Sequence, residues 1–221
     1  MAQKKLLLID GNSVAFRAFY ALYRQLDRFT SPDGLHTNAI FTFKNMLDAI
    51  MKQTNPTNVL VAFDAGKVTF RTEMYQDYKG GRQKTPSELS EQLPVIREML
   101  KDLGIKSYEA DDIIGTLSKM GEDAGYTVDI VTGDRDLTQL ASDKTTVLIT
   151  KNGVGDTEAY TPDHMKEVNG VTPTEFIDMK ALMGDNSDNY PGVTKVGPKT
   201  ASRLIQKYGS IEELYEHVDE M

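Results

Sequence analysis

Short apolar runs that stop at an acidic residue are the clearest pattern in the chain. The first two cover residues 4–10 and 58–64, and the third covers 127–132 and is followed by Gly133 and Asp134. A further apolar run covers 145–150. Runs of this length, rich in leucine, isoleucine and valine and bounded by turn-forming residues, are typical of buried strands. We therefore predict four strands, three of which lead directly into an acidic turn.

Longer segments between the strands have the periodicity of amphipathic helices. We predict helices at about 14–20, 38–53, 86–103 and 173–183, the last one capped by Thr172. The apolar side chains on one face of the second helix are Ile40, Phe43, Met46, Leu47 and Ile50. Strands that alternate with helices predict an α/β fold, in which helices flank a mainly parallel central sheet.

The same pattern divides the chain into two parts. Residues 1–160 form the predicted α/β core, interrupted by a polar and basic segment at about 67–88. Residues 161–221 form a predicted helical part, in which glycines, a proline and lysines at about 184–207 introduce a helix. Most acidic candidate residues fall in the first part, and a cluster of basic ones falls in the second.

Acidic residues stand where the predicted strands end. Asp10 and Asp64 end the first two apolar runs, and Asp134 and Asp136 follow the third. Ligands of an open parallel sheet bind beyond the carboxyl ends of its strands, so these side chains are expected to converge. One such aspartate is commonly only a turn or cap residue. The same chemistry at several strand ends favours a shared metal site.

The stretch from Tyr108 to Thr116 is the expected centre of that site. It is predicted as a helix that starts with Glu109, Asp111 and Asp112. Acids in a first turn also suit the helix dipole, which is the simpler interpretation. Three carboxylates so close together repel one another unless a cation lies among them, and their oxygen atoms suit Mg²⁺ or Mn²⁺. Further acids, in a later loop, are Asp185 and Asp188.

Basic residues gather in two segments, although the formal charge of the whole chain is −8. Residues 67–84 hold five basic residues against two acidic ones, a charge of +3, with Tyr75 and Tyr78 among them. Bases of a single strand could stack on the tyrosines while phosphates pair with lysine or arginine. A solvated loop with incidental tyrosines is the alternative. The basic candidates in this segment are Arg71, Lys79 and Arg82.

The second basic segment, residues 192–207, holds four basic residues and no acid. Backbone N–H groups at a glycine-rich helix start bind phosphate without distinguishing bases. The segment therefore suits the backbone of duplex DNA, although a helix hairpin that merely packs is the alternative. The candidate contacts are Lys195, Lys199, Thr200 and Arg203.

Composition narrows the remaining choices. The chain has no cysteine, which excludes disulfides, thiolate zinc sites and cysteine nucleophiles. It has no secretory signal and no apolar run long enough to span a membrane, so the expected location is the cytoplasm.

Taken together, the motifs resemble the 5′-nuclease domain of bacterial DNA polymerase I, in the flap endonuclease family. The resemblance covers nearly the whole chain in one order. Its motifs are LIDGNS at 8–13, FD at 63–64, YKGGR at 78–82, YEADD at 108–112, TGDRD at 132–136 and MGDNSDN at 183–189. The segment 193–201 is similar to the family's helix–three-turn–helix, which we place at about 184–207.

The resemblance implies a role for each candidate residue. The ligands of a first metal would be Asp10, Asp64, Glu109 and Asp111. The ligands of a second would be Asp134, Asp136, Asp185 and Asp188, with Asp112 acting through water. Arg17 would support the scissile phosphate, Tyr78 would stack a base, and Lys79 and Arg82 would lie in an arch around the 5′ strand. The helix–three-turn–helix would hold the duplex, with K⁺ among its carbonyls.

The implied activity is a 5′-3′ exonuclease and flap endonuclease that uses Mg²⁺, with Mn²⁺ as a substitute. Its partners would be DNA with a 5′ flap or a 5′ end next to duplex, and an RNA primer on DNA, in replication and repair. The resemblance also implies a monomer near the bacterial nucleoid, a chain cut short at its C-terminus, and a polymerase domain in the full protein. There are two alternatives. One is a non-catalytic DNA-structure binding module, in which the short connection before Tyr108 disrupts the metal site. The other is a PIN-like ribonuclease.

Overall fold

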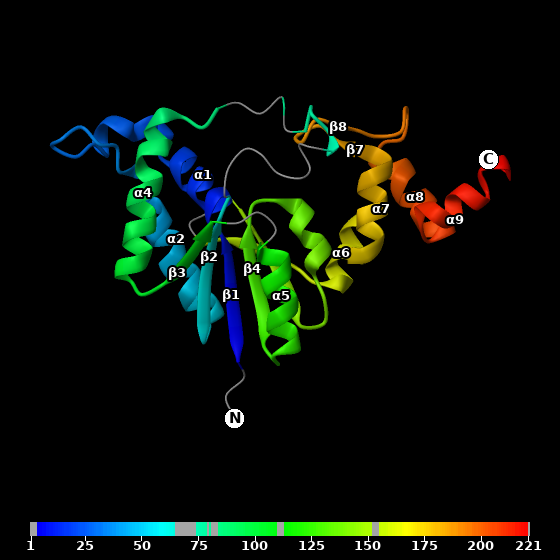
Figure 1. The fold of residues 1–221 in the computed structure, drawn as a ribbon, viewed down its shortest axis with the longest axis horizontal. Coiled ribbons are helices and arrows are strands. Elements are labelled where there is room, and N and C mark those ends of the chain that lie inside the picture. The colour runs from blue at the N-terminus through cyan, green and yellow to red at the C-terminus, as the bar shows by residue number, and fades with distance from the viewer. Residues whose placement is uncertain are drawn as a thin grey trace. The chain divides into compact units, whose positions relative to one another are not determined.

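The computed structural model describes residues 4–64, 74–78, 80, 84–109, 113–151 and 155–220 (Figure 1). They belong to two compact units. The first unit comprises Met1–Ala65 and Lys84–Tyr160, and the second comprises Gly66–Gln83 and Thr161–Met221. Among the described residues, no helix is long and apolar enough to cross a membrane.

A six-stranded sheet forms the centre of the first unit. Its strands are β1 (Lys5–Asp10), β2 (Asn58–Phe63), β3 (Lys106–Glu109), β4 (Thr127–Thr132), β5 (Thr145–Thr150) and β6 (Thr157–Tyr160). The strand order is β3-β2-β1-β4-β5-β6, and every neighbouring pair is parallel except β5 with β6. The predicted α/β fold with a mainly parallel sheet is confirmed.

Helices cover both faces of this sheet (Figure 1). They are α1 (Gly11–Ala21), α2 (Asn38–Thr54), α4 (Ser87–Asp102) and α5 (Ile113–Asp123), with short 3-10 helices η1 (Tyr23–Arg28) and η2 (Arg135–Leu140). Leu7 and Ile9 of β1 belong to the core shared with α1, α2 and α4. Their neighbour Leu6 points to the opposite face, where Gly121 of α5 approaches it closely.

The second unit is helical around a two-stranded hairpin. Its elements are α6 (Pro162–Asn169), α7 (Pro173–Met183), β7 (Gly184–Asp185), β8 (Tyr190–Pro191), α8 (Pro198–Tyr208), α9 (Ile211–Glu216) and η3 (Val218–Glu220). Thr172 caps α7 as predicted, in a capping box: its side chain accepts from the N–H of Glu175, whose carboxylate accepts from the N–H of Thr172. The sequence did not predict α6, α9, the hairpin of β7 and β8, or η3.

One prediction about the acidic stretch is wrong. Glu109 does not begin a helix, because it is the last residue of β3 and pairs with Phe63 of β2. The helix that follows begins at Ile113. The backbone of Glu109 pairs with the neighbouring strand β2. This strand pairing outweighs the preference of an acidic residue for the first turn of a helix. Glu109 and Asp112 therefore do not share a helix face.

Candidate functional site

The turn from β1 into α1 brings the first predicted acid to the carboxyl edge of the sheet. Asp10 is the N-cap of α1, and its Oδ1 accepts from the N–H of Ser13 at 2.9 Å. The next residue has to be glycine, because a Cβ at Gly11 would lie 2.6 Å from the ring of Phe63. The chain thus passes from strand to helix without a loop, and the Asp10 carboxylate is held at the strand end.

A chain of hydrogen bonds ties this carboxylate to the end of β4. Oδ2 of Asp10 accepts from the hydroxyl of Thr132 at 2.8 Å, and that hydroxyl oxygen accepts from the N–H of Asp134 at 2.9 Å. The N–H of Gly133 donates to the hydroxyl of Ser13 at 2.7 Å. The ends of two neighbouring strands are therefore joined through side chains, which fixes Asp134 close to Asp10.

The electrostatics of Asp10 shows that acids from three strand ends act on one another. Burial raises the pKa of Asp10 from 3.8 to about 6, while the N–H of Ser13 and the hydroxyl of Thr132 lower it. The charges of Asp64 and Asp134 raise this pKa further. Because each of these carboxylates disfavours ionisation of Asp10, a cation among them would be strongly attracted.

The described residues contain only part of the predicted metal ligand set. The N–H of Asp136 donates to Oδ1 of Asp134 at 2.9 Å, at the start of η2. Asp111, Asp112 and the side chain of Glu109 lie outside the described residues. Among the residues that are described, no three acids or histidines are grouped closely enough to hold one metal ion. The donor chemistry fits a hard divalent cation, and the complete ligand set stays a prediction.

Of the arginines in this unit, Arg17 was predicted from the sequence as a site residue, whereas a second one was not. Burial lowers the pKa of Arg17, and the charge of Asp156 opposes that effect. The other is Arg97 of α4, whose guanidinium carbon lies 4.9 Å from the centre of the Phe63 ring. Its position four residues after Leu93 of the apolar face is the signal that could have identified it.

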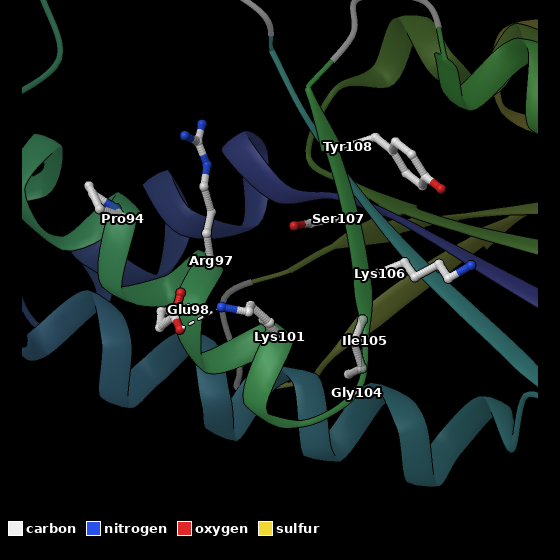
Figure 2. Close-up of a pocket in the computed structure, with 9 residues that line it drawn as sticks. All are labelled: Pro94, Arg97, Glu98, Lys101, Gly104, Ile105, Lys106, Ser107 and Tyr108. Atoms are coloured by element: carbon white, nitrogen blue, oxygen red, sulfur yellow. Dashed lines mark hydrogen bonds and ion pairs between the residues drawn. The ribbon is translucent and has the colours of Figure 1, made fainter.

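Arg97 lines a pocket of about 530 Å³ between α4 and the edge strand β3, together with Lys101, Lys106 and Tyr108. Figure 2 shows the Arg97 guanidinium directed along the strand toward its Tyr108 end, while Lys106 and Tyr108 leave the strand on the side away from α4. The Lys101 ammonium is paired with Glu98 at 3.0 Å. The basic groups of this pocket therefore do not converge on one point.

In the second unit, the acidic hairpin loop is highly organised. The carboxylate of Asp185 accepts from the ammonium of Lys180, and its Oδ1 accepts from the N–H of Ser187 at 2.7 Å and of Asp188 at 3.2 Å. Burial alone would raise the pKa of Asp185, but Lys180 and Ser187 hold it well below its ordinary value. The structure thus keeps Asp185 ionised and Asp188 beside it in the same turn.

The basic residues predicted to contact duplex DNA lie on and before α8. Lys195, Lys199 and Arg203 are exposed, whereas Ala201 and Ile205 are buried on the opposite side of the helix. Lys199 and Arg203 are one helical turn apart and share a face. Thr200 is half-buried in the first turn of α8. The arrangement offers a row of cations to a phosphate backbone.

The predicted arch residues are represented only in part. Tyr78 is half-buried, and its N–H donates to the carbonyl of Tyr75 at 3.0 Å. Arg71, Lys79 and Arg82 lie outside the described residues, so their predicted roles stay predictions.

Comparison with known proteins identifies the family. Residues 5–170 match the N-terminal, resolvase-like domain of the 5′-3′ exonuclease family, and residues 171–221 match its C-terminal SAM fold. The chain belongs to the 5′-3′ exonuclease family. The N-terminal match includes the sheet with its acidic edge, and the C-terminal match includes the basic start of α8.

The relatives of this 5′-3′ exonuclease chain agree with that membership. It is 62% identical over 224 residues to a DNA polymerase I of Lactococcus lactis subsp. cremoris, covering 98% of this chain and 26% of that protein. The chain therefore spans about a quarter of the length of the curated relatives it matches.

Solved structures share the fold at low identity. A phage T5 5′-exonuclease with bound zinc ions has a TM-score of 0.78 at 24% identity, covering 97% of this chain and 79% of that one. A phage T5 flap endonuclease in a complex with DNA and metal ions has a TM-score of 0.75 at 23% identity, covering 96% and 78%. At this identity the likeness establishes the fold alone.

Proposed function

We propose that this chain hydrolyses DNA phosphodiesters near a free 5′ end or a flap junction, with divalent metal ions at the carboxyl edge of its sheet. The observation that carries the proposal is the hydrogen-bonded link from Asp10 through Thr132 to Asp134. It holds acids from different strand ends within each other's field. Burial raises the pKa of Asp10 to about 6, and the charges of Asp64 and Asp134 add to this rise. A fold without a cation at this edge gains nothing from such repulsion.

The acids have distinct roles in this proposal. A first metal ion would be held by Asp10, Asp64, Glu109 and Asp111. A second would be held by Asp134, Asp136, Asp185 and Asp188, with Asp112 acting through water. Mg²⁺ suits these hard carboxylate oxygens, and Mn²⁺ would substitute. Bound metal ions of this type supply an activated water and offset the charge that develops on the phosphate.

The protein's own side chains would bind and orient the DNA. Lys195, Lys199, Thr200 and Arg203 would contact the duplex backbone, and carbonyls before α8 would accept K⁺. These contacts carry no sequence information, so the shape of the DNA would decide which substrate is cut. At the 5′ strand, Arg17 would support the scissile phosphate and Tyr78 would stack a base. The basic contacts there would be Arg71, Lys79 and Arg82.

The names of the relatives support a proposal about the partners of this chain in the cell. Curated relatives are named DNA polymerase I, and the chain spans about a quarter of their length. We propose that it works in the cytoplasm at the nucleoid, as a monomer, joined to a polymerase. Its substrates would be 5′ flaps and RNA primers on DNA, in replication and repair.

Paired aspartate substitutions test the metal-site assignment. Asp134→Ala removes a carboxylate from the hydrogen-bonded edge, and we expect at least a hundredfold loss of flap cleavage with an unchanged far-UV circular dichroism spectrum. Asp123→Ala, which removes an exposed acid of α5 that pairs with Lys119 at 3.1 Å, is the matched control and should cleave normally. Equal activity of the two variants would remove Asp134 from the site. Flap binding without cleavage by the unmodified chain, in Mg²⁺ or Mn²⁺, would instead indicate a non-catalytic DNA-binding module.

A further inference from the structure

Two contacts join segments of the second unit that are far apart in the sequence. The side-chain Nδ2 of Asn189 donates to the carbonyl of Asp77 at 3.0 Å, across 112 positions of the chain. Next to it, the rings of Tyr75 and Tyr190 meet edge to face, with centroids 6.0 Å apart and planes at 77°. Residues 74–78 are therefore attached to the hairpin of β7 and β8 by a polar and an aromatic contact.

The hairpin is a rigid partner for this attachment. Gly184 has a φ of +72°, and a Cβ there would lie 2.3 Å from the backbone nitrogen of Gly192. The Asp185 carboxylate closes the loop by accepting from the N–H groups of Ser187 and Asp188. Asn189 itself has a φ of 56°, a left-handed conformation that asparagine tolerates better than most residues. Asn189 thus belongs to a loop whose backbone is held in place on both sides of the hairpin.

On the other side, the attachment holds two consecutive turns. The carbonyl of Asp77, which accepts from Asn189, also accepts from the N–H of Gly80 at 2.9 Å. The N–H of Tyr78 donates to the carbonyl of Tyr75, whose ring packs on Tyr190. Both contacts therefore act on the turns that determine where Tyr78 lies.

We propose that Asn189 and Tyr190 are positioning residues, which anchor the turns around Tyr78 to the loop that carries Asp185 and Asp188. The inference rests on the proposed function, in which Tyr78 receives a base of the 5′ strand and the two aspartates hold metal. The anchor joins Tyr78, the proposed contact with the 5′ strand of the DNA, and the loop of Asp185 and Asp188 into one rigid element. A single strand that engages Tyr78 would then be held at a fixed distance from Asp185 and Asp188, and a duplex without a free strand would not use the anchor.

Hydrogen exchange tests the anchor without any need for activity. The amides of Tyr78 and Gly80 are expected to exchange about tenfold faster in Tyr190→Leu and in Asn189→Gly, because each variant removes one of the two contacts. Glycine keeps the left-handed backbone, so the second variant isolates the side-chain hydrogen bond. Tyr190→Phe keeps the ring and should exchange like the parent chain. Tyr215→Leu, at a tyrosine of α9 with 70% of its surface exposed, is the control. Unchanged exchange in both anchor variants would overturn the proposal.

DNA binding separates this inference from the proposed function. In the anchor variants we expect the dissociation constant for a 5′-flap duplex to rise about fivefold or more, while that for the same duplex without a flap stays constant, both measured by fluorescence anisotropy in EDTA. An equal loss for both DNAs, or no loss for either, would contradict the role in strand positioning. If the parent chain binds both DNAs equally, the proposed binding of the 5′ strand by Tyr78 is wrong. Hydrogen exchange of Tyr78 and Gly80 would still decide whether the anchor exists.

Discussion

Because the pKa of Asp10 is raised, we predict that removing its carboxylate charge stabilises the metal-free protein at neutral pH. In the folded protein the pKa is about 6, against an ordinary value of 3.8. Below pH 3.8 the carboxyl is protonated in both the folded and the unfolded chain, so its titration does not change the free energy of unfolding. Between 3.8 and about 6 only the folded chain keeps the proton, so the free energy of unfolding falls as the pH rises through this window.

The magnitude follows from the size of the pKa change. One pKa unit corresponds to about 1.4 kcal/mol, so well above pH 6 the ionised Asp10 lowers the free energy of unfolding by about 3 kcal/mol. Asp10→Asn removes this cost. The asparagine Oδ1 still accepts from Ser13, but the Thr132 hydroxyl loses its carboxylate acceptor, which costs about 1 kcal/mol. The expected net gain in the metal-free protein is about 2 kcal/mol near pH 7.5.

Urea unfolding in EDTA at about pH 4 and pH 7.5 measures this effect. We expect Asp10→Asn to be slightly less stable than the parent chain at the lower pH and more stable at the higher pH. Asp123→Asn, at an exposed acid of α5, is the control and should change little at either pH. The same stability difference between Asp10→Asn and the parent at both pH values would refute the buried, like-charged environment that we assign to Asp10.

Three further predictions concern the framework, each measured by urea unfolding at neutral pH. Gln92→Leu should lower the free energy of unfolding by about 3 kcal/mol. The fully buried Gln92 side chain accepts from the N–H groups of Ala39 and Ile40 at the start of α2, and leucine leaves both without that acceptor. A loss below about 0.5 kcal/mol would exclude this capping role. Thr172→Ala should cost about 1 kcal/mol through the loss of the α7 capping box, and a Thr172→Ser variant should recover most of it. Gly184→Ala should cost about 2 kcal/mol or more, because the backbone is left-handed and the added methyl meets the nitrogen of Gly192, and a neutral result would disprove the tight hairpin.

The part of the fold that follows from the sequence is the part with strong periodic signals. The apolar runs became β1, β2, β4 and β5, and the amphipathic segments became α1, α2, α4 and α7. The edge strand β3 was missed because its residues Lys106, Ser107 and Tyr108 are exposed and carry no apolar alternation. Pairing with β2 forms this strand, and such pairing is not encoded in local sequence.

The candidate site shows the same division between local and long-range information. The position of acids after strand ends was visible in the sequence, because parallel strands bring their carboxyl ends to one edge. The link from Asp10 to Asp134 was not, since it depends on a threonine hydroxyl between strands that are 122 residues apart in the chain. The contact of Asn189 with Asp77 was hidden for the same reason.

Cleavage of a labelled 5′-flap duplex by this 221-residue chain is the most direct test of the central claim. The assay compares Mg²⁺, Mn²⁺ and EDTA on the flap substrate, with a single-stranded RNA of the same sequence as the competing substrate. We predict metal-dependent cutting of the DNA near the flap junction and none in EDTA. Cutting that persists in EDTA, or activity on the RNA with none on the DNA flap, would contradict the assignment of a metal-dependent 5′ nuclease.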